Sequence, residues 1–225
     1  MDEIAIKQKL SDSLKLIAAC FYEPEIKLFE EEKILQNLSH LLESLCPEAS
    51  ISVNNMLHIL QNSDQEDLQV AHAELFVGPF ELKASPYGST YLEKERMVMG
   101  DSTMEVLDHY RRAGLKVDIK EPPDHIAIEL EYLSYFSALE AEALQNGDLK
   151  KAAELQAEQK LFLETYMLPW MAQLVQNIRS GTENKFYLHF ADCFEKFLGQ
   201  LEIINKPTNI YEQDGVKVYA DATIY

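Results

Sequence analysis

The residues best suited to chemistry lie together in one short segment, residues 121–125, which read Glu-Pro-Pro-Asp-His. Asp124 and His125 can hold or move a proton, and Glu121 adds a second carboxylate. Glu129, four residues after His125, would lie on the same face of a helix. The pair could ligate a metal, but two ligands do not complete a site, and an ordinary hydrogen-bonded pair is the simpler interpretation. An enzyme would use His125 as a general base held by Asp124 or Glu129, yet the chain offers no nucleophile to accompany it.

The usual catalytic and cofactor motifs are absent from the sequence. It contains no G-x-x-x-x-G-K-[ST], G-x-G-x-x-G, G-x-S-x-G or H-E-x-x-H pattern, so phosphate loops, dinucleotide folds, serine hydrolases and zincins lack support. Cys20, Cys46 and Cys193 form no C-x-x-C pair and are odd in number, which predicts reduced packing residues. We therefore expect no catalytic residue, no metal and no cofactor.

A helix is predicted to position Asp124 and His125. Pro122 and Pro123 fix an extended backbone, and apolar residues then recur at helical spacing over 126–144. Asp124 and His125 fall at the opening turn of this helix. A carboxylate there can accept unpaired amide hydrogens, so helix capping explains Asp124 well and leaves His125 unexplained.

The remaining chain also reads as helices, which predicts an all-α protein built as a single-domain bundle over residues 1–205. A hinge between two helical halves is expected near 118–124, and Pro169 is expected to kink or split its helix. The loop at 79–100 is too long to be a simple connection. In the tail 206–225, Asp214-Gly215 between alternating residues indicates a short β-hairpin. Further helices are predicted at 3–22, 26–45, 51–61, from a capping box at Ser63 to Gly78, from a second box at Ser102 to Gly114, at 149–179 and at 182–204.

The charge of the chain limits its partners. The formal net charge is -18, with 8 basic against 17 acidic residues in 1–100 and 12 against 21 in 101–225, so the excess is evenly spread. Such a field repels nucleic acid and anionic membranes and would speed encounters with a basic partner, although acidic soluble proteins are also common. No apolar run reaches membrane-spanning length and no export signal opens the chain, so we expect a cytoplasmic protein without stable membrane association.

Several short motifs follow one another along the chain. They are Phe-Tyr-Glu-Pro at 21–24, Glu-Leu-Phe-Val-Gly at 74–78, Ser-Pro-Tyr-Gly-Ser at 85–89 with Tyr-Leu at 91–92, Gly-Asp-Ser-Thr at 100–103, Glu-Pro-Pro-Asp-His at 121–125, Leu-Pro-Trp at 168–170 and Phe-Tyr at 186–187. In these motifs and their order, over roughly residues 10 to 205, the chain resembles the TorD/DmsD-type maturation chaperones.

The resemblance implies an all-helical, non-enzymatic chaperone. Such proteins bind the twin-arginine leader and the apo form of a molybdopterin oxidoreductase, and hold it for cofactor insertion before export. Weak guanine-nucleotide binding is implied for some members, as is either a monomer or a helix-swapped dimer, for which the connection at 120–123 is the natural hinge. The leader-binding residues it implies are Asp124 and His125 with Glu121 and Glu129, and Tyr22, Tyr87, Ser89 and Tyr91 as walls of the same groove.

Physical reasoning supports the same kind of site. A leader with two guanidinium groups and an apolar stretch needs fixed carboxylates beside an aromatic trough. Asp124 could supply a carboxylate, and Tyr87 and Tyr91 the trough. Two other interpretations stay open: a generic helical interaction scaffold, and a nucleotide-binding or hydrolytic helical protein that uses His125.

Overall fold

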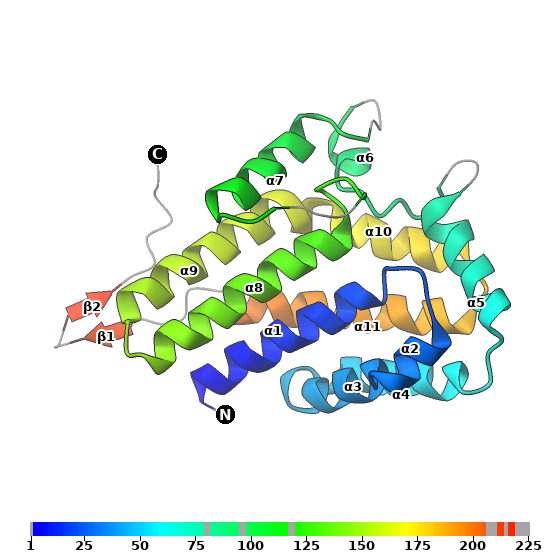
Figure 1. Ribbon diagram of the computed structural model, residues 1–225, viewed down its shortest axis with the longest axis horizontal. Helices are drawn as coiled ribbons and strands as arrows, with labels where there is room; N and C mark the ends of the chain where they lie inside the picture. The colour runs from blue at the N-terminus through cyan, green and yellow to red at the C-terminus, as the bar shows by residue number, and fades with distance from the viewer. Residues whose placement is uncertain are drawn as a thin grey trace.

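The computed structural model describes residues 2–78, 82–94, 98–116, 120–205, 211–213 and 216–218. Helix α8 (Ile126–Gln145) runs through the middle of the molecule, with α1 (Glu3–Ala19) on one side and α9 (Leu149–Phe162) on the other (Figure 1). α1 also packs against α3 (Ile34–Leu45). The predicted all-α bundle is therefore confirmed, and residues 121–125 stand at the start of its central helix.

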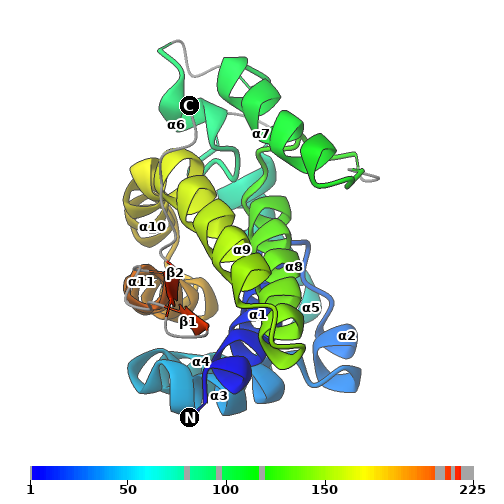
Figure 2. The same ribbon diagram turned by 90° about the vertical axis from the view of Figure 1, so that its left-hand side faces the viewer.

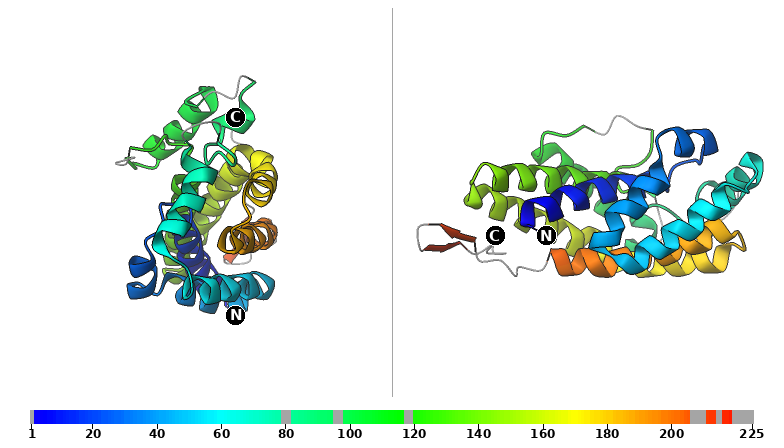
Figure 3. Two further views of the ribbon diagram at one scale, coloured as in Figure 1. Left: turned by 90° about the vertical axis from the view of Figure 1, so that its right-hand side faces the viewer. Right: turned by 90° about the horizontal axis from the view of Figure 1, so that it is seen from below.

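The second half of the bundle joins early and late parts of the chain. α4 (Pro47–Leu60) packs on both α3 and α11 (Lys185–Ile204), and α11 packs on α10 (Leu168–Gly181). Because α1 contacts α8 and α4 contacts α11, helices before residue 117 interleave with helices after it (Figure 3). The hinge expected near 118–124 includes residues outside the described part of the chain and stays a prediction.

Shorter elements complete the fold around this bundle. α6 (Ser89–Leu92) and α7 (Asp101–Arg112) lie together along one edge, above the bundle in Figure 2. The strands β1 (Tyr211–Gln213) and β2 (Val216–Val218) pair antiparallel, Glu212 opposite Lys217, and lie beside α9. This pairing agrees with the predicted hairpin, whose turn at 214–215 lies outside the described residues. The remaining helical elements are α2 (Ile26–Glu31), α5 (Gln65–His72) and the π-helical segments η1 (Ala73–Val77) and η2 (Leu163–Met167).

Two predicted helix limits were wrong for backbone reasons. The helix predicted over 26–45 breaks into α2 and α3 at Lys33, which takes a left-handed conformation with φ of 52°. The helix predicted over 51–61 begins earlier, because Pro47 occupies its first turn, where a missing amide hydrogen costs nothing. Pro169 does interrupt its helix as expected. The helix predicted over 149–179 is divided into α9 and α10 by the π-helical segment η2, and Pro169 lies in the first turn of α10.

Both predicted capping boxes were also wrong. Asp64, not Ser63, caps α5 by accepting from the amides of Glu66 and Asp67. At α7 the cap comes from another helix, because the Glu93 carboxylate accepts from both the amide and the hydroxyl of Ser102. Glu93 therefore ties the end of α6 to the start of α7.

The bundle core is rich in aromatic side chains and includes a buried ion pair. Phe21 of the α1 exit packs edge to face on Phe190 and Phe194 of α11. Lys7 of α1 lies 3.0 Å from Glu140 of α8, and both side chains are buried. Removing one partner of such a pair leaves an uncompensated charge, so the pair fixes how α1 sits on α8.

The three free cysteines are all buried, as their predicted packing role requires. Burial raises the pKa of the Cys193 thiol to about 12, so it stays protonated and unreactive at neutral pH. None of the helices in the described ranges combines the length and apolar character needed to cross a membrane.

Candidate binding site

The structure brings the motifs at 85–89 and 121–125 together in space. A single antiparallel bridge pairs Tyr87 with His125, in which the Gly88 amide donates to the Asp124 carbonyl at 2.9 Å and the Ile126 amide donates to the Pro86 carbonyl at 2.8 Å. The loop at 85–92 is thus held against the start of α8.

Capping at this junction differs from the sequence expectation. His125 caps α8, because its Nδ1 accepts from the Ala127 amide at 3.2 Å. Asp124 instead accepts from the Ser89 amide at 2.7 Å, at the first residue of α6. Asp124, which was predicted to cap α8, therefore holds the start of α6. His125, which had no predicted structural role, caps α8.

Three rings gather at the junction and form what we call the Tyr-His-Tyr cluster, consisting of Tyr22, Tyr87 and His125. The Tyr22 ring stacks parallel to His125 with centroids 5.9 Å apart, and Tyr87 meets His125 edge to face at 5.4 Å. The Tyr22 hydroxyl donates to Glu131 at 3.1 Å, and the Tyr87 hydroxyl donates to Glu121 at 2.6 Å. Each half-buried tyrosine thus carries a carboxylate at its polar end.

The protonation states of the cluster follow from its burial. Burial lowers the pKa of His125 to about 4 against the opposing effect of Glu121 and Asp124, so the imidazole is neutral at pH 7. Because Nδ1 accepts a hydrogen bond, the proton of the neutral ring lies on Nε2. Burial and the adjacent carboxylates raise the pKa of both tyrosines, which keeps their hydroxyls as donors.

Besides His125, three of the predicted site residues are buried inside the protein. Asp124 and Glu129 are each 1% exposed, and Ser89 is fully buried. Burial, aided by the charge of Asp124, raises the pKa of Glu129 well above its usual range, which favours the protonated carboxyl. Neither Glu129 oxygen is hydrogen-bonded to the described residues, so the expected hydrogen bond between His125 and Glu129 does not form. Within those residues, no group of three or more potential ligands could hold a metal.

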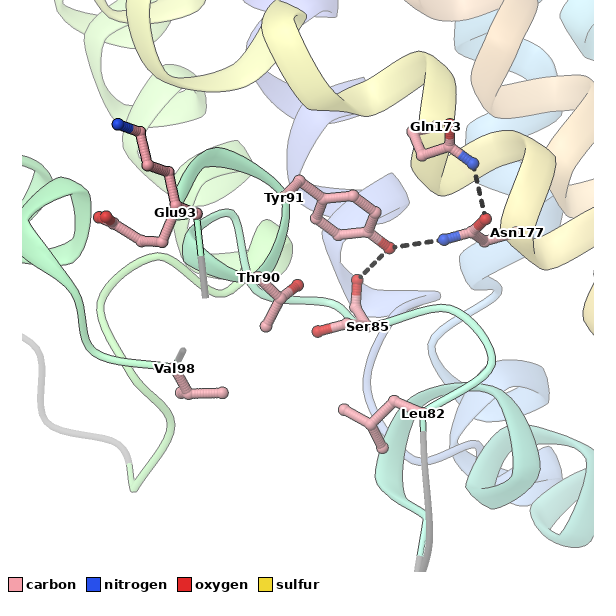
Figure 4. Close-up of a pocket in the computed structure, with 9 residues that line it drawn as sticks. Leu82, Ser85, Thr90, Tyr91, Glu93, Val98, Gln173 and Asn177 are labelled. Atoms are coloured by element: carbon pink, nitrogen blue, oxygen red, sulfur yellow. Dashed lines mark hydrogen bonds between the residues drawn. The ribbon is translucent and has the colours of Figure 1, made fainter. Parts of the chain in front are cut away.

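Tyr91 faces a different space from Tyr22 and Tyr87. Its ring stacks on Trp170 of α10 at 5.1 Å, and its hydroxyl donates to the Ser85 carbonyl at 2.9 Å and accepts from Asn177 at 3.3 Å (Figure 4). Ser85, Tyr91 and Asn177 border a cavity of about 610 Å³. The cavity is lined by Leu82, Ser85, Thr90, Tyr91, Glu93, Lys94, Val98, Gln173 and Asn177.

The loop at 85–92 therefore separates two surfaces, with the Tyr-His-Tyr cluster on one side and this cavity on the other. Gly88 lies directly against Trp170, since a Cβ atom there would approach the indole nitrogen to 3.1 Å. A side chain at position 88 would push the loop away from α10. The groove that the sequence predicted with Tyr22, Tyr87, Ser89 and Tyr91 as its walls is divided between these two surfaces and the buried interior.

Sequence reasoning did not select several residues that complete these surfaces. Glu131 gives no sequence signal, because it reads as one of many exposed helical glutamates. Trp170 was noted only within its Leu-Pro-Trp motif, and Gln173 and Asn177 follow it on α10 at helical spacing. The signal that could have found the last two is the recurrence of polar residues three and seven positions after a buried indole.

Comparison with known proteins gives consistent results. The family model described as nitrate reductase delta subunit matches residues 32–176. The chain is 27% identical over 188 residues to the chaperone protein TorD of Vibrio parahaemolyticus, covering 81% of this chain and 86% of that protein. It is also 27% identical over 161 residues to the Tat proofreading chaperone DmsD of Salmonella typhi, covering 71% of this chain and 64% of that one.

A solved structure agrees with these sequence relatives. The fold superposes on a protein of Archaeoglobus fulgidus described as a redox enzyme maturation protein, with a TM-score of 0.55 and 27% identity, over 84% of this chain and 93% of that one. The site motifs, the helical fold and the relatives lead to one assignment. The chain belongs to the nitrate reductase delta subunit family, the family of TorD and DmsD redox-enzyme maturation chaperones.

Proposed function

We propose that this protein is a cytoplasmic chaperone that binds the twin-arginine leader and the apo form of a molybdopterin oxidoreductase, and holds that enzyme for cofactor insertion before export. The observation that carries the proposal is the Tyr-His-Tyr cluster with its two attached carboxylates, at the junction of two of the motifs that resemble the family. Aromatic faces beside carboxylates suit guanidinium groups, and the chain's charge of -18 favours the approach of a basic segment.

Charge alone is too weak to hold a leader. An exposed arginine-carboxylate pair contributes about 0.2 to 1 kcal/mol, whereas micromolar binding requires about 8 kcal/mol. Burial of about 600 Å² of apolar surface would give about 15 kcal/mol before the costs of association and ordering, which remove much of it. Leu92, Val98 and Met99 are exposed, and Val98 lines the cavity together with Leu82. These exposed side chains offer an apolar surface to the apolar stretch of the leader, separate from the cluster that would hold its arginines.

A titration with synthetic leaders tests the proposal. A labelled peptide with two arginines and an apolar stretch is expected to bind with micromolar affinity, and a peptide with both arginines replaced by glutamine is expected to bind at least tenfold more weakly. Retention of a molybdoenzyme precursor by the full chain, in extract, is the companion result. Equal binding of both peptides would refute leader recognition and favour the generic helical scaffold.

A further inference from the structure

Two tyrosine-carboxylate pairs contact the central ring of the Tyr-His-Tyr cluster. Tyr22, bonded to Glu131, stacks on the face of His125, and Tyr87, bonded to Glu121, meets the same ring edge to face. The two tyrosine rings are at most about 11 Å apart, the sum of their centroid distances to His125. In each pair the tyrosine hydroxyl engages one carboxylate oxygen, and among the described residues no hydrogen bond is found to the other.

Each pair has the chemistry of a guanidinium receptor. A carboxylate accepts two parallel hydrogen bonds from a guanidinium group, and an adjacent aromatic face attracts its charge. Both tyrosines are half-buried and Glu131 is exposed, so each receptor is partly open to solvent. An ammonium group lacks the planar fork, which makes these pairs selective for arginine over lysine.

His125 supplies a separate observation that points to a ligand. The residue is 5% exposed and its ring contacts both tyrosine rings, yet its protonated Nε2 has no hydrogen-bond partner within the described part of the chain. A neutral imidazole N–H donates to a carbonyl, and it does not repel a neighbouring cation. The His125 imidazole is therefore suited to a peptide main chain, and the two tyrosine-carboxylate pairs are suited to cations.

We infer that two consecutive arginines of the leader divide between the two pairs, one guanidinium on Tyr22 and Glu131 and the other on Tyr87 and Glu121. This inference rests on the proposed function. Neighbouring residues of an extended chain point to opposite faces, so the leader backbone crosses over His125 and one of its carbonyls accepts from Nε2. Consecutive arginines fit this arrangement because each arginine reaches a different tyrosine-carboxylate pair.

The arrangement also changes the role of the buried acids. Asp124 is a positioning residue, because it holds the start of α6 through the Ser89 amide and is itself closed to solvent. Glu129 is buried, and its raised pKa favours the uncharged form, so it offers the leader no accessible carboxylate. Glu131, which the sequence did not indicate, replaces them as an arginine ligand.

Double-mutant cycles between protein and peptide test the inference. The full chain and its Glu131→Gln and Glu121→Gln variants are titrated with leaders that carry Arg-Arg, Gln-Arg or Arg-Gln. Each variant is expected to bind the Arg-Arg leader about fivefold more weakly. For each variant, replacing one of the two leader arginines by glutamine is expected to weaken binding no further. That arginine is expected to be one of the pair for Glu131→Gln and the other for Glu121→Gln. Glu142→Gln, an exposed glutamate on the same helix, serves as the charge control and is expected to bind all three leaders like the unmodified chain.

The outcomes separate this inference from the proposed function. If the unmodified chain fails to bind the Arg-Arg leader, the proposed function is wrong. If it binds, but both glutamates couple to the same arginine or to neither, only the division of the arginines is overturned. Tyr22→Phe and Tyr87→Phe keep the ring and are expected to retain binding within threefold, whereas leucine at either position is expected to weaken it by about fivefold. Equal losses for phenylalanine and leucine would overturn the role of the aromatic faces.

Discussion

Replacing Asp124 by alanine tests whether this carboxylate holds the loop or binds a ligand. The change removes a charge-assisted hydrogen bond of 2.7 Å and leaves the buried Ser89 amide without a partner. A hydrogen bond to a charged group contributes about 1.5 to 3 kcal/mol, and an orphaned buried donor is costly, so we expect a loss of about 2 to 3 kcal/mol in unfolding free energy. For a chain of this length the melting temperature should fall by about 4 to 12 °C.

Two comparisons make this prediction sharp. Asp148→Ala removes a carboxylate that caps α9 in solvent by accepting from the Lys151 amide, and should cost only about 1 kcal/mol. Asp124→Asn keeps an oxygen that can accept from Ser89, so it should lose at most about 1 kcal/mol and retain leader binding. Thermal melting and peptide titration are measured on all three variants. If Asp124→Asn abolished leader binding with unchanged stability, Asp124 would be a direct ligand and the positioning argument would be refuted.

Three further predictions follow from other contacts. Glu129→Gln should change the free energy of unfolding by less than about 0.5 kcal/mol near pH 4.5. Because the pKa of Glu129 is raised in the folded protein, the folded state binds a proton more tightly than the unfolded state, and the unmodified chain should become less stable relative to the variant as pH rises above 4.5. Equal pH dependence of the two proteins in urea unfolding would contradict this. Tyr91→Ala should weaken leader binding more than Glu131→Gln, since it removes the stack on Trp170 beside the cavity, and equal losses in titration would count against an apolar contribution. Lys33→Gly should raise unfolding free energy by up to about 1 kcal/mol by relieving a left-handed backbone, and a fall in the urea midpoint would contradict the strain argument.

The sequence was sufficient for the helical class because apolar periodicity reports which face of a helix is buried. It was insufficient for helix ends, where one residue decides the outcome. Lys33 breaks a continuous apolar stripe by adopting a positive φ, a conformation that a lysine in the sequence does not predict. At Ser102 the cap comes from Glu93 on another helix, and local spacing cannot reveal a partner brought in by the tertiary fold.

The candidate site was predictable in part. The sequence selected Tyr22, Tyr87 and His125 from motifs far apart in the chain, and the structure places their rings in contact. It could not separate them from Tyr91, because the side of the loop that a residue faces depends on how α6 lies against α10. Nor could it distinguish buried from exposed carboxylates, which is a property of packing and decides the expected roles of Glu129 and Glu131.

The π-helical segment at 163–167 makes the spacing of the chain part of the binding surface. Such a segment is equivalent to one extra residue in an otherwise regular helix, and each residue turns an α-helix by about 100°. Deleting one residue from 163–167 would restore a regular helix and rotate Trp170 away from Gly88 and Tyr91. The length of this segment, and not only its residue types, therefore limits how far the sequence can change. If the side chains of α10 were shifted by one residue, they would support neither the loop nor the cavity.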